Sequence, residues 1–209
     1  MKKNKQFLYD YLNAYAPVAQ ETEGQKIWTN YIKPYCDFLY TDAYGTSYGV
    51  RNHKFKDGDE QTSNIPKVVI EAHCDEIAWI ITYIEDSGMI RVKRHGGSDN
   101  MIAPSKTVMI HTHSGTKVRG LFGWPAIHTR KSYVEKGYEQ EELWVDTGLK
   151  DKEAVNNAGV EVGNLITFDD QFHEMGDYYV GRSLDNKIGG YIIAEALRKI
   201  HDKGINLPY

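Results

Sequence analysis

The sequence predicts an α/β fold with a mixed sheet, interrupted by an inserted, small all-β domain of barrel-like type. Three observations lead to this prediction: helical periodicity near both ends, an apolar run typical of a buried strand, and closely spaced short β segments between them. An α/β pattern that stops for an all-β stretch and then resumes indicates an insertion. We therefore expect residues 1–76 and 180–209 to form the α/β domain, and residues 77–179 to form the inserted β domain.

Two amphipathic helices are predicted near the N-terminus. In each, apolar residues recur at i, i+1, i+4, i+5 and i+8, which places them on one face of a helix. Thr22, followed by Gln25, has the spacing of a capping box at the start of the second helix. The apolar positions are Phe7, Leu8, Tyr11, Leu12 and Tyr15 in the first helix, and Ile27, Trp28, Tyr31, Ile32 and Tyr35 in the second.

A strand buried on both faces is predicted at Pro66–Ile70, because the run is apolar and does not alternate with polar residues. It leads directly into the polar stretch Glu71–Glu76. A shorter strand is predicted at Phe38–Thr41. Since ligands bind at the carboxyl ends of strands in open α/β sheets, the residues after Ile70 are the first candidates for a functional site.

Short strands joined by Gly-containing turns follow Ile77, and such closely spaced strands indicate a small barrel or sandwich. A helical period then returns and ends at Gly204, a residue typical of a helix C-terminus. The predicted elements are hairpins of Ile77–Ile84 with Met89–Val92 and of Val108–His113 with Lys117–Phe122, strands at Leu143–Val145 and Leu165–Phe168, and helices at Asp151–Ala158 and Asn186–Lys203.

The composition excludes several classes of partner. The 209 residues include 25 Lys+Arg and 29 Asp+Glu, and a net charge of −4 gives no electrostatic footprint for nucleic acid. No apolar run reaches the roughly 18 residues of a membrane helix, and two cysteines cannot form a disulfide framework. The lysines before Phe7 imitate a signal peptide, but Asp10 and Asn13 interrupt its apolar part. We therefore expect a cytoplasmic protein that binds neither nucleic acid nor membranes.

His73 and Asp75 are the first candidates for a chemical role. They follow the predicted strand two residues apart, so both side chains point to one face if the strand geometry continues. A histidine can ligate a metal ion through one ring nitrogen while a carboxylate accepts a hydrogen bond from the other. The same spacing is also compatible with a partly buried histidine that is only hydrogen-bonded to its neighbour.

Asp185 is the second candidate. It precedes the last predicted helix, where aspartate is a common N-cap because its oxygen accepts a backbone N–H bond. If Ser183 caps the helix instead, Asp185 can serve as a metal ligand. Two-metal hydrolases hold their ions roughly 3.5–4 Å apart, which is close enough for one carboxylate to bridge both. Position alone leaves both interpretations open.

The residues around these candidates carry a resemblance to a known family. Glu71–Ile77 resembles the metal-binding strand of the dinuclear metallo-aminopeptidases, which include glutamyl, deblocking and tetrahedral (TET) aminopeptidases. Some members of that family have been labelled cellulases or endoglucanases. The resemblance is to the N-terminal portion of the family, spans most of the chain, and continues in order through Ile84–Gly88, Gly96-Gly97, Pro125–His128, Val145–Gly148, Gly159–Gly163 and Gly181–Gly189.

The resemblance implies a metallopeptidase domain that holds two divalent ions, Zn²⁺ or Co²⁺. His73 would bind one ion, Asp75 would take part in catalysis by orienting the imidazole, and Asp185 would bridge both ions. The inserted β domain would contribute to assembly and to the shape of the substrate chamber. The implied function is removal of N-terminal residues from peptide substrates by a homo-oligomer.

Two departures from the family pattern bear on this expectation. Family members commonly carry Asp-Asp-Arg, but here Asn186 and Lys187 follow Asp185, so one charge is lost and a guanidinium becomes an ammonium. In relatives the next strand brings two adjacent glutamates, a metal ligand and the general base, and a later Asp and His complete the set. This sequence reaches Tyr209 before any such strand. We therefore expect the front portion of an enzyme, inactive by itself.

Weaker candidates offer no replacement for the missing residues. Glu141-Glu142 is adjacent but lies in a polar run typical of a solvated charge cluster. His111 and His113 alternate on a predicted strand, where an exposed hairpin face explains them as well as an ion does. Cys74 would point away from His73 and is expected to pack in the core.

Two other functions stay open on the sequence. A non-catalytic relative could keep the fold for assembly or peptide binding, as Asn186 and Lys187 would allow. A glycosidase would need a pair of carboxylates roughly 5–10 Å apart across a sugar-binding groove.

Overall fold

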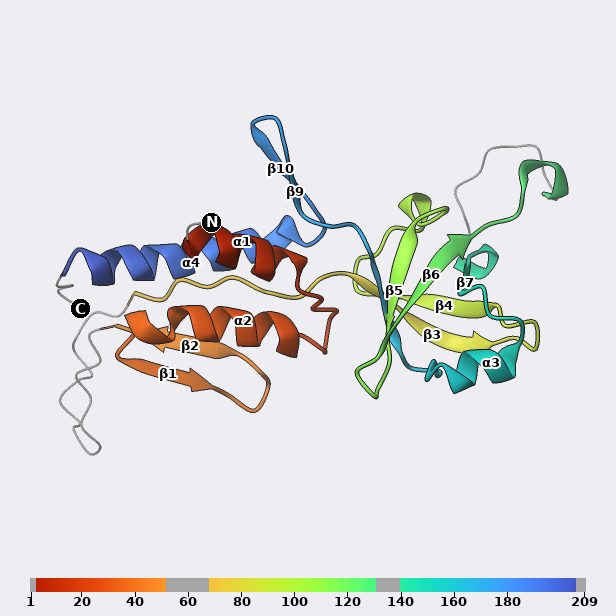
Figure 1. Cartoon of the computed structure of the whole chain (residues 1–209), viewed down its shortest axis with the longest axis horizontal. Helices are drawn as coiled ribbons and strands as arrows, with labels where there is room; N and C mark the ends of the chain where they lie inside the picture. The colour runs from red at the N-terminus through yellow and green to blue at the C-terminus, as the bar shows by residue number, and fades with distance from the viewer. Residues whose placement is uncertain (1–2, 52–67, 131–139, 206–209) are drawn as a thin grey trace. The chain divides into compact units, whose positions relative to one another are not determined.

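The computed structural model describes residues 3–51, 68–130 and 140–205, which form two compact units (Figure 1). Unit 1 consists of Met1–Asp75 and Phe172–Tyr209, and unit 2 consists of Glu76–Gln171. Each unit has its own hydrophobic core.

Unit 2 is built around six strands. Its elements are β3 (Ala78–Ile84), β4 (Ile90–His95), η3 (Asn100–Ile102), β5 (Thr107–His111), β6 (Lys117–Gly123), η4 (Ile127–Thr129), η5 (Gln140–Glu142), β7 (Trp144–Asp146), α3 (Lys152–Asn157) and β8 (Leu165–Phe168). The strands close into an antiparallel barrel in the order β3-β4-β7-β6-β5-β8. The two predicted hairpins, β3 with β4 and β5 with β6, are confirmed.

Aromatic side chains fill the centre of the barrel. Trp79 is fully buried, with its ring centroid 4.9 Å from that of Phe122 and 4.8 Å from that of Phe168. Beside the barrel, the Asp151 carboxylate caps α3 by accepting a hydrogen bond from the Ala154 N–H at 2.8 Å. Inward-facing residues of a closed sheet need no second layer to cover them, so unit 2 has a complete core of its own.

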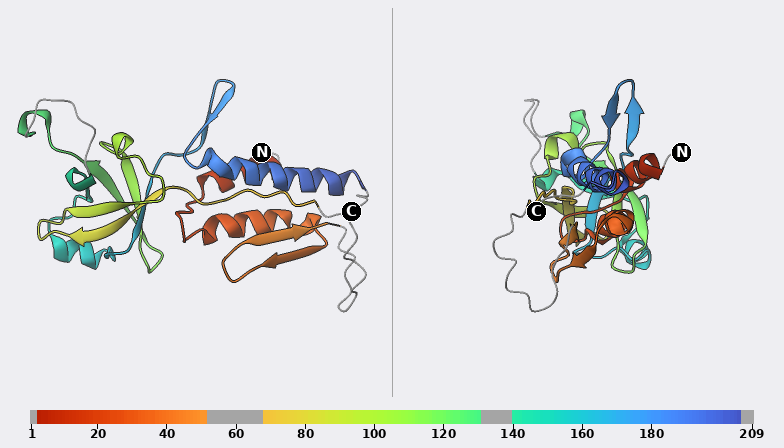
Figure 2. Two further views of the ribbon diagram at one scale, coloured as in Figure 1. Left: turned by 180° about the vertical axis from the view of Figure 1, so that it is seen from behind. Right: turned by 90° about the vertical axis from the view of Figure 1, so that its left-hand side faces the viewer.

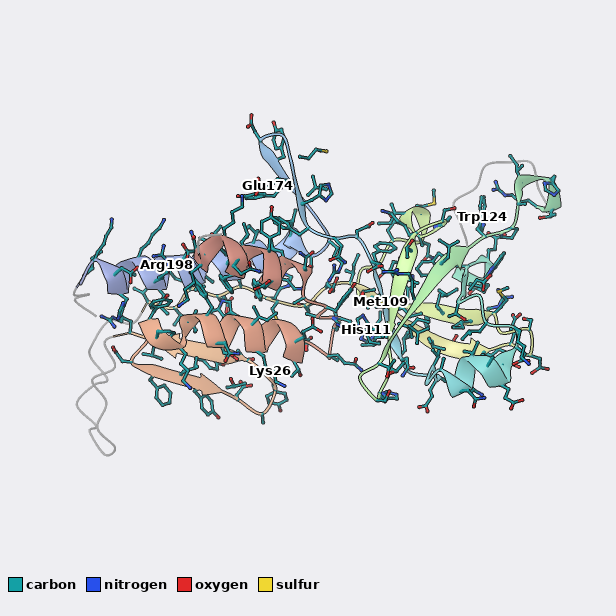
Figure 3. All side chains as sticks on the ribbon, in the orientation of Figure 1. Lys26, Met109, His111, Trp124, Glu174 and Arg198 are labelled. Carbon is teal, nitrogen blue, oxygen red and sulfur yellow. The ribbon has the colours of Figure 1, made fainter. Side chains whose placement is uncertain are left out.

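Unit 1 contains the three longest helices. Its elements are α1 (Lys3–Asn13), α2 (Thr22–Ile32), η1 (Lys33–Tyr35), β1 (Phe38–Thr41), β2 (Ser47–Val50), β9 (His173–Met175), β10 (Tyr178–Val180) and α4 (Leu184–Asp202). The helices α1, α2 and α4 lie side by side, and the β1–β2 hairpin lies against α2 (Figures 1 and 2). The β9–β10 hairpin projects from the helices, and its Glu174 is bound by Lys5 and Tyr9 of α1 at 2.8 and 2.9 Å (Figure 3).

The predicted apolar stripes of the first two helices meet in the core of unit 1, which confirms the helical periodicity. The rings of Phe7 and Tyr31 stack with centroids 3.8 Å apart, and Tyr11 packs beside them. Cys74 is 8% exposed in the same cluster, as expected for a residue that faces away from His73.

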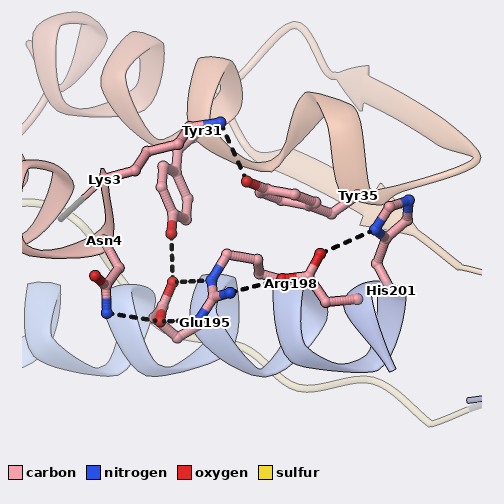
Figure 4. Close-up of polar contacts among 8 residues, drawn as sticks. Lys3, Asn4, Tyr31, Tyr35, Glu195, Arg198 and His201 are labelled. Carbon is pink, nitrogen blue, oxygen red and sulfur yellow. Dashed lines mark hydrogen bonds and ion pairs between the residues drawn. The ribbon is translucent and has the colours of Figure 1, made fainter. Parts of the chain in front are cut away.

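A polar network joins the three helices inside this core (Figure 4). The Glu195 carboxylate on α4 is bound by two nitrogens of Arg198 at 2.8 and 2.9 Å, by the hydroxyl of Tyr31 on α2, and by Asn4 of α1 at 3.4 Å. Arg198 also binds Asp202 at 2.7 Å. The hydrogen-bonded guanidinium of Arg198 lowers the pKa of Glu195 below its ordinary value. The network therefore holds a charged carboxylate between α1, α2 and α4.

Two local predictions are wrong. The helix α2 begins at Thr22 with Glu21 in the N-cap position and no side-chain cap bond, so Thr22 does not form a capping box. Val68–Ile70 belongs to no strand, and its three side chains are 59, 80 and 67% exposed. A buried strand needs pairing along its edges and cover on both faces, and no described strand pairs with this segment. Pro66 and Lys67 lie outside the described residues.

Strands β2, β9 and β10 had no counterpart among the sequence predictions, because each has only three or four residues, too few to show an alternating pattern. The last helix is confirmed, and Gly204 follows it with a positive φ of 59°. Within the described ranges, none of the helices combines the length and apolar character that a membrane crossing requires. Both cysteines, Cys36 and Cys74, are free thiols.

Replacing Glu195 by glutamine is expected to lower the free energy of unfolding of unit 1 by about 2 kcal/mol at neutral pH, because hydrogen bonds to a charged group contribute roughly 1.5–3 kcal/mol. The pKa of Glu195 lies below its ordinary value of 4.5 in the folded protein. The difference between wild type and Glu195→Gln is therefore fully present above that value and is lost as the pH falls through the lowered pKa. Urea unfolding followed by far-UV circular dichroism at a series of acidic pH values measures it.

The matched control is Glu161→Gln, the same change at an exposed position of unit 2, which is expected to leave unfolding unchanged. A difference between wild type and Glu195→Gln that stays constant into acid would contradict the assigned charge state of Glu195.

Candidate metal site

The structure brings His73, Asp75 and Asp185 of unit 1 together. The Nδ1 atom of His73 lies 2.9 Å from Oδ1 of Asp75, and its Nε2 atom lies 3.2 Å from Oδ1 of Asp185. His73 and Asp75 lie on the extended segment that follows Ile70, and Asp185 lies at the start of α4. The imidazole is thus held between two carboxylates that are far apart in sequence.

All three side chains are open to solvent. The side chain of His73 is 55% exposed, that of Asp75 34% and that of Asp185 96%. Ion pairs at such exposure contribute little to stability, because water screens the charges and keeps the groups hydrated. The cluster is therefore poorly explained as a stabilising interaction, and a cation can reach its ligand atoms from solvent.

The backbone at the start of α4 aims Asp185 toward His73. Ser183 occupies the N-cap position in the left-handed region, with φ 56°, and makes no side-chain cap bond. Asp185 and Asn186 have non-helical dihedral angles, and the peptide bond between them is cis. Asp185 thus lies in a turn before the regular helix, which starts at Lys187. Asp185 is therefore not the N-cap of the helix, and its carboxylate faces the imidazole of His73 instead.

Close packing of the first turns of α4 depends on two adjacent glycines. A Cβ atom at Gly189 would lie 3.1 Å from the Cβ of Ala72, directly before His73. A Cβ atom at Gly190 would lie 2.7 Å from the hydroxyl oxygen of Tyr11 on α1. The carbonyl of Gly190 also accepts a hydrogen bond of 2.9 Å from the indole N–H of Trp28. Sequence analysis missed this packing, although a pair of glycines inside a predicted helix was a signal for it.

The ligand atoms present suit a divalent cation. Two ligand atoms of a tetrahedral Zn²⁺ with bonds of roughly 2.0–2.2 Å lie about 3.3–3.6 Å apart, and the observed separation of Nε2 and Oδ1 is 3.2 Å. Asp75 occupies the position from which a carboxylate orients a metal-binding histidine through its other nitrogen. In the described part of the chain, no group of three or more His, Cys, Asp or Glu residues is arranged to hold a metal ion.

The weaker candidates lie elsewhere. On β5 of unit 2 (Figure 3), the Nε2 atom of His111 is 2.9 Å from the hydroxyl of Thr167. His113 is exposed, and Glu142 ends the short η5 turn. Cys74 packs in the core of unit 1, and burial raises the pKa of its thiol to about 11, which keeps the thiol protonated at neutral pH.

Comparisons with known proteins agree with the resemblance seen in the sequence. The family model for M42 glutamyl aminopeptidases matches residues 56–208. The chain is 31% identical over 209 residues to the protein named "Putative aminopeptidase FrvX" of Escherichia coli strain K12, covering 98% of this chain and 55% of that protein. The chain thus spans about half the length of the relatives that it matches.

Solved structures share the fold. A TET aminopeptidase from Thaumarchaeota archaeon SCGC AB-539-E09 matches with a TM-score of 0.86 and 24% identity, over 98% of this chain and 55% of that one. Aminopeptidase APDkam598 from Desulfurococcus kamchatkensis matches with a TM-score of 0.82 and 27% identity, over 94% and 52%. The TET1 peptidase of Pyrococcus horikoshii, described as assembling into a tetrahedron or a large octahedral shell, matches with a TM-score of 0.76 and 21% identity, over 96% and 57%.

Replacing Gly190 by alanine is expected to destabilise unit 1 by about 1–3 kcal/mol, the usual effect of overpacking a core. The sign of this change in the free energy of unfolding is informative, because a glycine-to-alanine replacement inside a helix otherwise stabilises the protein by roughly 0.8–1 kcal/mol. Removing the hydroxyl that the new methyl would meet, in the double variant Gly190→Ala/Tyr11→Phe, should recover part of the loss. Urea unfolding of the single and double variants gives the measurement.

Gly97→Ala serves as the control, since a Cβ atom there would meet nothing within 4 Å. Equal or greater stability of Gly190→Ala would show that α4 does not approach α1 as closely as described.

Proposed function

The chain belongs to the M42 glutamyl aminopeptidase family, and from this premise we propose that it is part of a metal-dependent aminopeptidase that removes N-terminal residues from peptides. The observation that carries the proposal is the imidazole of His73, bounded by Asp75 on one nitrogen and by Asp185 on the other. This arrangement supports a metal ligand with an orienting carboxylate on one side and a second ligand on the other.

Each of the three side chains has a distinct role in the proposal. His73 binds an ion through Nε2, while Asp75 accepts the Nδ1–H bond and so keeps the imidazole in the tautomer that can bind. Asp185, whose carboxylate faces the imidazole of His73, would help to hold the same ion and could be shared with a second one. A pair of bound divalent ions, Zn²⁺ or Co²⁺, lowers the pKa of a shared water and polarises the carbonyl of the scissile peptide bond.

The remaining ligands and the general base are proposed to come from outside the 209 residues. Catalytic zinc sites generally use three protein ligands for each ion, whereas His73 and Asp185 are two in all. The resemblance to the family points to a pair of glutamates, one a ligand and one the group that moves the proton between water and the leaving amine. On this proposal the chain alone is inactive.

We further propose that unit 2 is an inserted β domain that contributes to assembly and to the substrate chamber of a homo-oligomer. The support is the match to TET peptidases, of which the Pyrococcus horikoshii protein assembles into closed shells. Free thiols at Cys36 and Cys74 are consistent with a cytoplasmic location.

A non-catalytic relative with the same fold is the second candidate. The departure at Asn186 and Lys187, together with the lack of a three-residue metal cluster among the described residues, favours it. Such a scaffold would keep the fold of unit 1 without needing two bound ions per chain.

Replacing Asp185 by alanine in the full-length protein is expected to reduce hydrolysis of aminoacyl anilides at least 1,000-fold, because removal of a ligand shared by two ions disrupts the whole metal site. Metal analysis after dialysis should show the loss of at least one ion per chain. The control is Asp177→Ala, an exposed aspartate at the tip of the β9–β10 hairpin, which should keep activity and metal.

Full turnover by Asp185→Ala would refute the assignment. Wild-type protein that binds no stoichiometric metal would favour the scaffold. Hydrolysis of a glucan but not of the anilide, unaffected by a chelator, would favour a glycosidase.

A further inference from the structure

Two cations flank Asp185 in sequence, and both reach the same end of α1. Arg182 donates from Nη2 to the carbonyls of Asn13 and Ala14, at 2.7 and 3.0 Å. Lys187 donates from Nζ to the carbonyl of Ala14 at 2.6 Å. The last carbonyls of a helix lack intrahelical partners and carry partial negative charge, so this helix end is a natural place for cations.

The burial of Lys187 requires an explanation. Its side chain is completely buried, although lysine is almost never fully buried unless it is paired. Transfer of an ammonium group out of water is unfavourable unless hydrogen bonds or opposite charges compensate it. The buried ammonium of Lys187 is therefore held to the position where it can donate to the Ala14 carbonyl, and this fixes the backbone that carries it.

The side chain of Asp185 has little else to orient it. It is 96% exposed, so packing around the carboxylate does not restrict its direction. Its direction must come from the backbone of the turn between Arg182 and Lys187, which is fastened at both ends to the end of α1. The guanidinium of Arg182 is further held over the ring of Tyr15, at 4.1 Å from the centroid.

The segment before this turn, which includes Phe172, is also hydrogen-bonded to the end of α1. The side-chain oxygen of Asn13 accepts a hydrogen bond of 2.8 Å from the backbone N–H of Phe172. A Cβ atom at Gly181 would lie 3.0 Å from the Cα of Phe172, so a larger residue there would require the two backbones to move apart by a few tenths of an ångström. The C-terminal end of α1 thus serves as a common attachment for the residues on both sides of Asp185.

We propose that Lys187 is a positioning residue for the metal site: its buried ammonium, anchored on the Ala14 carbonyl, fixes the turn that holds the Asp185 carboxylate opposite His73. The inference deepens the proposed function and rests on it. It also accounts for Lys187 where the family resemblance has arginine, since both residues can donate to a helix carbonyl.

The test compares Lys187→Met with Lys187→Arg. Co²⁺ alone is titrated into the full-length protein, and the ring-proton NMR signals of His73 report binding at this histidine. We expect Lys187→Met to weaken Co²⁺ binding roughly 10–100-fold, the usual effect of losing a group that orients metal ligands. Lys187→Arg should bind within about threefold of wild type. The matched control, Lys199→Met, makes the same change at an exposed position of α4 and should bind like wild type.

A second readout uses no metal. The ¹⁵N shift of His73 Nε2 reports whether the Asp185 carboxylate is beside it, and Asp185→Ala defines the shift expected when that carboxylate is absent. In metal-free Lys187→Met the signal should move to the Asp185→Ala position, whereas in Lys187→Arg and Lys199→Met it should remain at the wild-type position.

The outcomes separate the two claims. If Asp185→Ala binds Co²⁺ as wild type does, the proposed metal site itself is refuted. If Asp185→Ala loses binding while folded Lys187→Met keeps wild-type affinity and the wild-type Nε2 shift, only the positioning role is overturned. If Lys187→Met does not fold, Lys187→Arg decides, and a tenfold loss of affinity or a failure to fold in that variant also rejects the positioning role.

Discussion

The close approach of α4 to α1 is the constraint on which the candidate site depends. Gly189 and Gly190 allow the first turns of α4 to lie against Ala72 and Tyr11: a Cβ atom at Gly190 would lie 2.7 Å from the Tyr11 hydroxyl, and one at Gly189 would lie 3.1 Å from the Cβ of Ala72. This approach brings the turn that carries Asp185 next to the segment that carries His73. Two ligand atoms from distant parts of the chain can hold one ion only if such a contact fixes their separation within a few tenths of an ångström.

The two ends of α4 have different tasks. Its N-terminal turn presents Asp185 to solvent, whereas its C-terminal half carries Glu195, whose carboxylate binds side chains of α1 and α2 and is also bound by Arg198. A site placed on a helix that is held along its length can be more exact than one placed on a free loop. The helix that carries the exposed carboxylate of Asp185 is thus held in place by the buried polar network around Glu195, which does not contact Asp185.

Periodicity and turn residues were sufficient to predict α1, α2, α4 and the barrel hairpins, because these elements depend on local sequence. Motif resemblance was sufficient to select His73 and Asp185. The sequence predicted that Val68–Ile70 is buried, but the structure shows this segment exposed. Its burial would need neighbouring strands, and the described residues do not supply them. The hydrogen bond from Lys187 to the Ala14 carbonyl could not be predicted either. The sequence shows that a lysine replaces the arginine common in the family, but it does not show where the ammonium group lies.

The exposure of Val68–Ile70 has a consequence for how the chain behaves in solution. These three adjacent β-branched side chains are exposed, and no described strand pairs with them, so other molecules can add to the run as strands, the first step of aggregation. In the sequence, Lys67 and Glu71 flank this run, and charges in such positions act as gatekeepers by limiting sheet stacking. High ionic strength is expected to increase aggregation, because it screens the repulsion between the charges of Lys67 and Glu71 and those of other molecules but does not reduce the apolar surface of the run.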